Sequence, residues 1–406
     1  MRVIYFHQYF NTPEMVGGTR SYEIAKRMVE AGHQVHMVTT RTEGAIQDEQ
    51  WDIEEVDGIT VHWLSVQYSN KMGALQRILA FTKFAREAGA YGSKLQGDVI
   101  FATSTPLTVA IPGVKVSRKL GVPLVFEVRD LWPEVPIAMG ALRFPLSAWL
   151  ARQLEKWAYR NSKWVIGLSP GMCDGIVKAG FPKDRVKCIP NGADVGLFQG
   201  AKISSQAFKD SREWLGNRPL VLYPGAVGRV NGLGYMVDLA KFALAINPEV
   251  RFLVVGDGGE LSLIKSRAED AGVLGVNFFI EPQVPKNEIP NIFNAATVCC
   301  SWVIDVKALW NNSANKVFDA FAAGKPVVIN HGGWLRDLLE RESAGLALPL
   351  DDLEGAAKQL IDFLEDSRCL AKSGQAALRL AREDFSRDKL ASEVIQVLEM
   401  VVNDRA

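Results

Sequence analysis

The strongest constraint on the fold is an alternation of short apolar runs and longer helical patterns along the whole chain of 406 residues. Apolar runs of about four to eight residues are typical of buried strands, and apolar residues at a helical spacing follow them repeatedly. Such alternation favours parallel sheets with helices on both faces. The sequence therefore predicts an α/β protein with doubly wound, Rossmann-like sheets.

This alternation occurs twice, which predicts two domains. In the first half, the expected strands are residues 3–6, 34–39, 60–64, 99–102, 124–128, 164–168 and 186–189. In the second half, they are residues 220–223, 251–255, 276–280, 297–301, 327–330 and 345–348. The chain length also exceeds that of one ordinary domain.

The expected boundaries follow from where the periodicity weakens. Residues 1–195 form the first domain, which ends after the turn-forming pair Asn191-Gly192. Residues 196–217 are expected to be a linker, and residues 218–385 form the second domain. Residues 386–406 are expected to be a C-terminal helix that could pack back on the first domain. Two such domains facing each other would form a cleft.

Composition excludes several classes of protein. The chain is 48% hydrophobic and 23% charged with no net charge, which indicates a soluble globular protein and not a nucleic-acid binder. The five cysteines lack a Cys-x-x-Cys spacing and the five histidines lack a metal-binding one, so we expect reduced thiols and no metal site. The chain opens with a strand, and no apolar run reaches about 18 residues. We therefore expect a cytoplasmic protein whose membrane contact, if any, is peripheral, at the inner face of the cell membrane.

A polar loop that runs into a short helix, residues 311–326, is the first candidate site. The helix is expected from Lys316 to Ala323, and Gly324 ends it. Unpaired backbone N–H groups at a helix start, with Lys316 in its first turn, favour a bound anion such as phosphate. Asp319 could accept hydrogen bonds from hydroxyl groups one turn later. Together these features favour a nucleotide sugar, and the alternative is an ordinary capped surface helix.

A glycine-rich loop follows the first strand of the second half. It contains Gly228 and Arg229 within residues 224–232. Glycines allow a ligand to approach the backbone, and an arginine can make forked hydrogen bonds to phosphate oxygens. Since arginines in such loops are often simple surface residues, Arg229 is informative mainly together with Lys316.

In the first half, the loop after the first strand ends with Gly17 and Gly18 before a helix. Paired glycines at a helix start permit a ligand to approach closely. The loop has no Gly-x-Gly-x-x-Gly directly after the strand, and this disfavours a nicotinamide-dependent enzyme.

Charged residues follow the expected strand 124–128. Arg129, Asp130 and Glu134 cluster there, next to the stiff pair Trp132-Pro133. Ligands bind at the carboxyl ends of strands in such sheets, so Asp130 or Glu134 could bind sugar hydroxyls or manage an acceptor proton.

Residues 70–96 form a basic amphipathic segment. Its cations are Lys71, Arg77, Lys83, Arg86 and Lys94, and only Glu87 opposes them. Two interpretations are open: the segment lies on anionic lipid headgroups, or it packs its apolar side on the first core while its cations are solvated.

Several of these motifs, in this order, resemble the retaining glycosyltransferases of family four, which have the two-domain GT-B architecture. The matching stretches are residues 17–18, 32–35, 169–172, 189–194, 228–229, 254–260 and 324–328. More narrowly, residues 312–316, 318–319 and 332–334 resemble the branch that contains N-acetyl-L-fucosamine transferases of O-antigen and capsule clusters.

The resemblance implies a retaining transfer from a nucleotide diphosphate sugar. The donor is expected to be UDP-linked, with an N-acetylated amino or deoxy sugar among the candidates. The acceptor is expected to be lipid-linked or a saccharide in cell-surface polysaccharide biosynthesis. The first domain would bind the acceptor and the second the donor, with no metal and no cofactor.

The resemblance also implies roles for individual residues. Asp130, Arg229 and Lys316 are the expected catalytic residues, with Arg229 and Lys316 on the diphosphate. Asp130 would help to orient the donor sugar or the acceptor. The expected donor-binding residues are Gly17, Gly18, Gly228, Gln283, Val284, Asn311, Ser313, Ala314, Asn315 and Asp319. Within this set, the N–H groups of residues 313–315 would bind the diphosphate and residues 283–284 the base.

Two departures from the family pattern matter. The family has two glutamates separated by seven residues, and Asn311 and Asp319 stand at those positions here. Asp319 can still bind the ribose, whereas Asn311 changes the charge near the sugar and argues against a plain glucose donor. The family also has a lysine five positions after the arginine, where this chain has Gly234. We infer that Lys316 supplies the missing positive charge.

Three alternatives remain. A nucleotide-sugar 2-epimerase shares the architecture but turns over its donor without an acceptor. A non-catalytic nucleotide-sugar-binding protein would account for the departures at Asn311 and Gly234. A dehydrogenase is the least favoured, because the dinucleotide fingerprint is missing.

Overall fold

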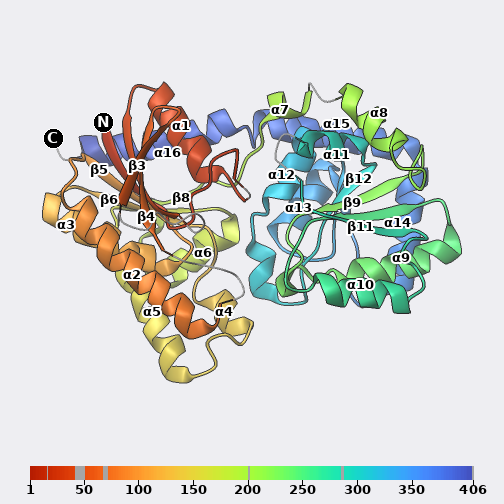
Figure 1. The fold of residues 1–406 in the computed structure, drawn as a ribbon, viewed down its shortest axis with the longest axis horizontal. Helices are drawn as coiled ribbons and strands as arrows, with labels where there is room; N and C mark the ends of the chain where they lie inside the picture. The colour runs from red at the N-terminus through yellow and green to blue at the C-terminus, as the bar shows by residue number, and fades with distance from the viewer. Residues whose placement is uncertain (16, 42–50, 67–71, 200–201, 285–287, 405–406) are drawn as a thin grey trace. The chain divides into compact units, whose positions relative to one another are not determined.

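The computed structural model describes residues 1–406 except 16, 42–50, 67–71, 200–201, 285–287 and 405–406. The chain forms two compact units. The first comprises Met1–Pro190, Asn311–Ser313 and Arg387–Ala406, and the second comprises Asn191–Trp310 and Ala314–Ser386. Each unit contains one mainly or wholly parallel sheet with helices on both faces (Figure 1). The predicted α/β class with two Rossmann-like sheets is confirmed.

The sheet of the first unit has eight strands in the order β3-β4-β2-β1-β5-β6-β7-β8. Their bounds are β1 Arg2–Phe6, β2 Gln34–Arg41, β3 Trp51–Val56, β4 Ile59–Ser65, β5 Val99–Thr103, β6 Leu124–Val128, β7 Trp164–Gly167 and β8 Val186–Cys188. All neighbours pair in parallel except β3 and β4. Every strand expected in the first half is present.

Strand β3 is an addition that the apolar pattern did not predict. It is an edge strand that forms an antiparallel hairpin with β4 through Asp57 and Gly58, both with positive φ. Positive φ at both central residues is what a tight hairpin turn of this kind requires. Asp52, Glu54 and Glu55 interrupt its apolar run, as charged side chains often do in edge strands.

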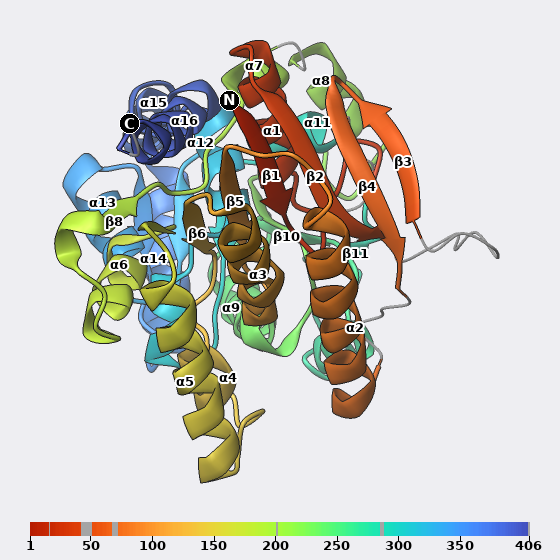
Figure 2. The same cartoon turned by 90° about the vertical axis from the view of Figure 1, so that its left-hand side faces the viewer.

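Two helical layers cover the first sheet. Helices α1 (Arg20–Glu30) and α16 (Arg387–Asn403) pack against each other and cover one face. Helices α2 (Ala74–Gly92), α3 (Ala110–Leu120) and α5 (Pro145–Arg160) cover the other face, with α3 between α2 and α5 (Figure 2). The connections also contain η1 (Leu107–Val109), α4 (Glu134–Ala138), α6 (Pro170–Lys178) and η2 (Lys183–Arg185).

The sheet of the second unit has six parallel strands in the order β11-β10-β9-β12-β13-β14. Their bounds are β9 Leu220–Pro224, β10 Arg251–Val255, β11 Phe278–Glu281, β12 Val298–Ser301, β13 Val327–Ile329 and β14 Gly345–Ala347. The third expected strand begins two residues later than predicted, since Val276 is exposed and lies outside the ladder.

Helices also cover both faces of the second sheet. Helices α9 (Gly234–Ile246), α10 (Leu261–Asp270) and α14 (Leu353–Glu365) enclose one core. The other face carries α11 (Ile289–Ala295), α12 (Asn315–Ala322), α13 (Trp334–Glu342) and α15 (Ser367–Glu383). Short η3 (Arg229–Asn231) and η4 (Lys307–Asn311) lie in the loops after β9 and β12.

The stretch 196–217, expected to be a linker, differs from that expectation. It contains most of α7 (Val195–Gln199) and all of α8 (Lys202–Asp210), which pack on α11. Phe198 and Leu215 are buried in the core of the second unit. The unit boundary lies at Pro190, five residues before the predicted position. Helices this short contribute too few apolar residues to show a clear period.

Both sheets have one point where the strand order reverses, between β1 and β5 in the first unit and between β9 and β12 in the second. Open α/β sheets bind ligands in the crevice outside the carboxyl ends of the strands at this point. The loops that leave these four strands are therefore the ones to examine for a site. Within the described ranges, none of the helices combines the length and apolar character needed to cross a bilayer.

Candidate active site

The glycine-rich loop after β9 is fixed to the neighbouring loop after β10. Gly225 and Val227 donate their N–H groups to backbone carbonyls of Val255 and of Asp257, each at 2.9 Å. A Cβ on Gly256 would lie 1.9 Å from the Gly225 carbonyl oxygen, so this close approach requires glycine. The two loops therefore form one rigid layer of backbone at the carboxyl edge of the second sheet.

Lys316 lies beneath this layer. Its Nζ is 3.6 Å from the centroid of the Tyr223 ring, and a Cβ added to Gly225 would lie 3.1 Å from Nζ. The Tyr223 hydroxyl donates to the carbonyl oxygen of Ala226 at 2.9 Å, which fixes the ring. Burial lowers the pKa of Lys316 to about 7. A bound anion would favour the ammonium form and raise this pKa.

Arg229 lies farther along the same loop, at the start of η3. Gly232, with a φ of 52°, ends η3 in the left-handed region, and a Cβ there would lie 3.1 Å from Ile304. Arg229 is exposed and lines a cavity of about 350 Å³ together with Arg267 and Asp305. Among the described residues, no carboxylate forms an ion pair with it. The structure thus places Gly228, Arg229 and Lys316 at the carboxyl end of β9.

Helix α12 begins at Asn315, one residue before its predicted start. Its N-cap, Ala314, has an extended backbone and makes no side-chain capping hydrogen bond. The first N–H groups of a helix need partners from outside it, and they attract anions. Asp319 is half-buried on the same helix, one turn beyond Asn315. Gly324, with a φ of 64°, follows the helix end as predicted.

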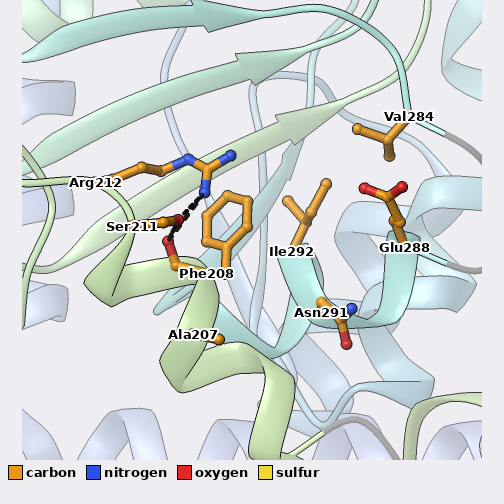
Figure 3. A pocket seen from close by; sticks show the side chains of 8 residues that line it. All are labelled: Ala207, Phe208, Ser211, Arg212, Val284, Glu288, Asn291 and Ile292. Carbon is orange, nitrogen blue, oxygen red and sulfur yellow. Dashed lines mark hydrogen bonds between the residues drawn. The ribbon is translucent and has the colours of Figure 1, made fainter.

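The expected base-binding residues, Gln283 and Val284, follow β11 at the edge of the second sheet. Gln283 is exposed, and Val284 lines a cavity of about 280 Å³ between α8 and α11 (Figure 3). Arg212 stacks over the Phe208 ring at 3.6 Å in this cavity and makes two hydrogen bonds of 2.7 Å to Glu281. Phe208 and Arg212 lie in the expected linker, which is why the sequence pattern did not single them out.

In the first unit, polar side chains from three strands meet at the carboxyl edge. Arg129, directly after β6, donates to His7 Nε2 at 3.1 Å. His7 follows β1, and burial together with the Arg129 charge holds its pKa well below the usual value, so it is neutral. Thr105, after β5, donates to Asp130 at 3.5 Å. His7 was missed in the sequence, although its place directly after the first strand was a usable signal.

Asp130 is half-buried in this network. Burial raises its pKa, and the positive charge of Arg129 and the hydrogen bond from Thr105 act in the opposite direction. The carboxyl group therefore lies between one hydrogen-bond donor, Thr105, and one nearby cation, Arg129.

A buried ion pair supports the same edge of the first unit. Arg20 on α1 contacts Glu127 on β6 at 2.8 Å, and both side chains are almost inaccessible. Thr103 donates to the second Glu127 oxygen at 2.6 Å. Burial alone would raise the pKa of Glu127, but the charges of Arg20 and Arg129 and these hydrogen bonds outweigh it, so the net shift is downward. Arg20 also donates to the carbonyl oxygen of Pro190 at 2.6 Å, which ties the end of the unit to its centre.

The predicted site residues are divided between the two units. Gly17, Gly18 and Asp130 belong to the first unit, and Asn311 and Ser313 are grouped with it. Gly228, Arg229, Gln283, Val284, Ala314, Asn315, Lys316 and Asp319 belong to the second unit. Gly17 has a φ of 138°, so the conformational freedom of glycine is used there. In the part of the chain that the structure describes, His, Cys, Asp and Glu side chains do not gather in groups of three that could hold a metal ion.

Comparison with known proteins gives two family matches that together cover most of the chain. Residues 17–192 match the glycosyl transferase 4-like domain, and residues 204–379 match the glycosyl transferases group 1. A colanic acid biosynthesis glycosyl transferase of Escherichia coli (strain K12) is 23% identical over 66% of this chain and 69% of its own length. A GDP-mannose-dependent alpha-mannosyltransferase of Mycobacterium tuberculosis is 24% identical over 77% of this chain and 75% of its own length.

Solved structures show the same fold over nearly the whole chain. The Anabaena protein HepE in complex with UDP and glucose has a TM-score of 0.73 and 20% identity, and the match covers 98% of this chain and 100% of that one. Sucrose-phosphate synthase from Thermosynechococcus elongatus has a TM-score of 0.79 and 18% identity, with 99% of both chains covered.

Proposed function

Because the chain belongs to the family-four, GT-B glycosyltransferases, with a 4-like domain followed by a group 1 domain, we propose that it uses a nucleotide diphosphate sugar, UDP-linked, as its donor. The sugar passes with retention of configuration to a lipid-linked or saccharide acceptor of a cell-surface polysaccharide. The HepE complex contains UDP and glucose. An Escherichia coli relative, 25% identical over 188 residues, is named for transfer from UDP-Gal to GlcNAc-diphosphoundecaprenol. Both support this donor and acceptor class.

The observation that carries the proposal is the position of Lys316. Its ammonium group lies beneath Gly225 and over the face of Tyr223, in the loop layer that also carries Arg229. Negative charge grows on the diphosphate as the glycosidic bond breaks. Cations fixed in advance stabilise this charge more in the transition state than in the ground state. The half-buried position of Lys316 increases the effect, because its field is less screened by water.

Other residues at the carboxyl edges of the two sheets provide the remaining contacts to the donor in this proposal. The N–H groups of Ser313, Ala314 and Asn315 bind the diphosphate at the start of α12, and Asp319 accepts hydrogen bonds from the ribose. The backbone of Gly17, Gly18 and Gly228 also contacts the donor in this proposal. Gln283 and Val284 contact the base, and Asn311 contacts the sugar. The donor sugar is an N-acetylated amino or deoxy sugar, since the amide of Asn311 replaces a carboxylate there.

In the chemical step, an acceptor hydroxyl oxygen forms a bond to the anomeric carbon on the face that the diphosphate leaves. The bond between that carbon and the phosphate oxygen breaks, and its electron pair stays with the phosphate. The acceptor proton passes to the departing phosphate oxygen, so no separate base is needed. Arg229 and Lys316 neutralise the leaving diphosphate, which is the role a metal ion would otherwise have. Asp130 orients hydroxyl groups through hydrogen bonds, in keeping with its raised pKa.

The first experiment is a thermal-shift screen against UDP-, GDP- and dTDP-sugars, repeated with EDTA. We expect at least one diphosphate sugar to raise the melting temperature, and the chelator to leave that shift unchanged. Arg229→Ala and Lys316→Ala should each reduce the shift. The matched control is Arg336→Ala, which removes an exposed cation of the same unit that pairs with exposed Glu340 one turn away.

Product analysis then tests the reaction. Release of nucleotide diphosphate that depends on an acceptor supports glycosyl transfer, whereas conversion of the donor alone would identify an epimerase. A full panel without any thermal shift would overturn the proposal. Tight donor binding without turnover on any lipid-linked or saccharide acceptor would favour a binding protein.

A further inference from the structure

Large exposed apolar side chains are concentrated on three neighbouring helices of the first unit. They are Leu75, Ile78 and Leu79 on α2, Ile111 on α3, and Phe144, Leu146, Trp149 and Leu150 at the start of α5. Leu75 is 71% exposed and Phe144 75%. The other exposed large apolar side chains among the described residues lie singly on separate elements, which is normal for a protein surface.

On each of the helices α2 and α5, these residues form an exposed stripe along one side. Leu146, Trp149 and Leu150 are separated by three and four positions, the spacing that places side chains on one side of a helix. Leu75, Ile78 and Leu79 have the same spacing. The opposite side of α2 is buried against the sheet through Phe84 and its neighbours. The outer stripes are therefore additional to the side of each helix that the core needs.

The exposed residues lie at the beginnings of the helices, and this places them at one edge of the unit. Helices α2, α3 and α5 each follow a parallel strand, namely β4, β5 and β6, and lead back to the next one. Such helices begin at the carboxyl edge of the sheet. Figure 2 shows α2 and α5 extending beyond the strands on either side of α3. Asp130 and His7 lie at this same edge.

Basic side chains follow the apolar turns on all three helices. Residues 72–96 and 134–163 contain nine Lys and Arg and three Asp and Glu, although the whole chain has no net charge. Helix α3 adds Lys115, Arg118 and Lys119 without an acidic residue. Cations near helix C-termini complement the helix dipole, but the dipole gives no reason for apolar first turns.

The order from the apolar turns to the cationic turns matches a membrane surface. Apolar and aromatic side chains lie at the acyl boundary of a bilayer, and lysines and arginines contact anionic headgroups above it. A second copy of the chain fits less well, because facing patches would bring two sets of like charges together. An anionic bilayer is therefore the partner whose chemistry agrees with both features.

We propose that the first turns of α2, α3 and α5 form a docking surface for an anionic lipid bilayer. Leu79 and Trp149 enter the headgroup region with their apolar neighbours, while Lys83 and Lys156, one and two turns farther along the same helices, contact lipid phosphates. This deepens the proposed function and rests on it only for the identity of the acceptor. A lipid-linked acceptor would reach the carboxyl edge that carries Asp130 directly from the membrane.

Vesicle flotation of the full chain tests the surface. We expect binding to phosphatidylcholine vesicles with about 30 mol% phosphatidylglycerol, little binding to phosphatidylcholine alone, and weaker binding in about 0.5 M salt. The paired substitutions Trp149→Ser with Leu150→Ser, and Ile78→Ser with Leu79→Ser, should each lower the partition coefficient about tenfold. Lys83→Gln with Lys156→Gln should remove the preference for anionic lipid. Leu263→Ser on α10, which alters a side chain that is 60% exposed in the second unit, should have no effect.

Three outcomes would overturn the proposal. The first is unchanged binding of both apolar double variants, and the second is equal binding of the wild type to neutral and anionic vesicles. The third is that light scattering without lipid shows a dimer of the wild type and a monomer of the Trp149→Ser, Leu150→Ser variant. Thermal shift with the nucleotide sugar separates the two proposals, because it depends on the second unit. A protein that binds the donor but not vesicles would retain the proposed function and lose this docking surface.

Discussion

The two units carry the same kind of sheet edge but equip it in different ways. In the second unit, the edge is a layer of glycine-rich backbone that carries the cations Arg229 and Lys316. In the first unit, the edge has a closed network in which Arg20 neutralises Glu127 and Arg129 contacts neutral His7.

Under the proposed function, this difference lets one fold serve two kinds of ligand. Positive charges left without carboxylate partners keep their field for an anion that arrives from outside, as a diphosphate does. Charges paired within the protein instead fix the geometry of a neighbouring group such as Asp130, to which we assign the binding of neutral hydroxyl groups. The comparison predicts that substitutions in the first network mainly change stability, whereas substitutions in the second mainly change turnover.

The largest expected effect is on stability, at Glu127. Glu127→Gln removes the carboxylate that neutralises the buried charge of Arg20, and breaking such pairs costs about 3–5 kcal/mol. Urea unfolding monitored by circular dichroism measures the free energy of unfolding. The control is Glu134→Gln, which removes the partner of exposed Arg152 and should change stability by no more than about 0.5 kcal/mol. Equal effects of the two variants would contradict the role given to the buried pair.

The same pair gives a pH dependence with a defined sign. The folded pKa of Glu127 is below that of an unfolded carboxyl group, so its stabilisation is fully present above the unfolded pKa of about 4.3. The stabilisation is lost as the pH falls through the folded value. The difference in unfolding free energy between wild type and Glu127→Gln should therefore shrink below about pH 4. A constant difference down to that pH and below it would show that Glu127 acts through packing and not through its charge.

The next effect is on turnover in the second unit. Lys316→Ala and Arg229→Ala should each lower kcat by about 10²- to 10³-fold, by analogy with the loss of one oxyanion-hole donor. The melting temperature of the unliganded protein should not fall for Arg229→Ala, since that side chain is exposed. Acceptor-dependent release of nucleotide diphosphate measures kcat, with Arg336→Ala as the control. Activity within threefold of the wild type in both variants would remove the basis for the proposed mechanism.

These differences also explain what the sequence could and could not predict. Glycine-rich loops after strands, Arg229 and the Lys316 helix are local features, so the sequence places them at the carboxyl edge of the second sheet. The pairs Arg20–Glu127 and Arg129–His7 join residues more than 100 positions apart and leave no periodic signal. Charged β3 and the short helices α7 and α8 were missed for the related reason that they carry few apolar residues in a regular pattern.

A smaller effect is expected from the pKa of Lys316. Its folded pKa of about 7 is below the unfolded value of about 10.4, so the unliganded protein should become more stable as the pH rises from 7 to 10. Donor binding should have the opposite sign, because the diphosphate needs the ammonium form. We expect the donor affinity to fall about tenfold between pH 7 and pH 9 and to be nearly independent of pH in Lys316→Met. Calorimetric titration with a non-hydrolysable donor measures the donor affinity of the wild type and of Lys316→Met at each pH. An affinity of the wild type that does not change with pH would rule out Lys316 as the titrating contact.

The smallest expected effect tests whether Lys316 replaces the lysine that the family carries at the position of Gly234. In the Lys316→Ala background, Gly234→Lys should restore kcat about tenfold, because it returns one positive charge to the start of α9. Gly234 has an ordinary φ, and the three atoms nearest to its new Cβ belong to the guanidinium group of Arg267, which pairs with Asp238 and would have to shift at the far end of its side chain. Gly234→Gln in the same background is the uncharged control of similar length. Equal rescue by lysine and glutamine would mean that position 234 acts through helix stability, whereas rescue by lysine alone requires a cation shared between two loops of one diphosphate site.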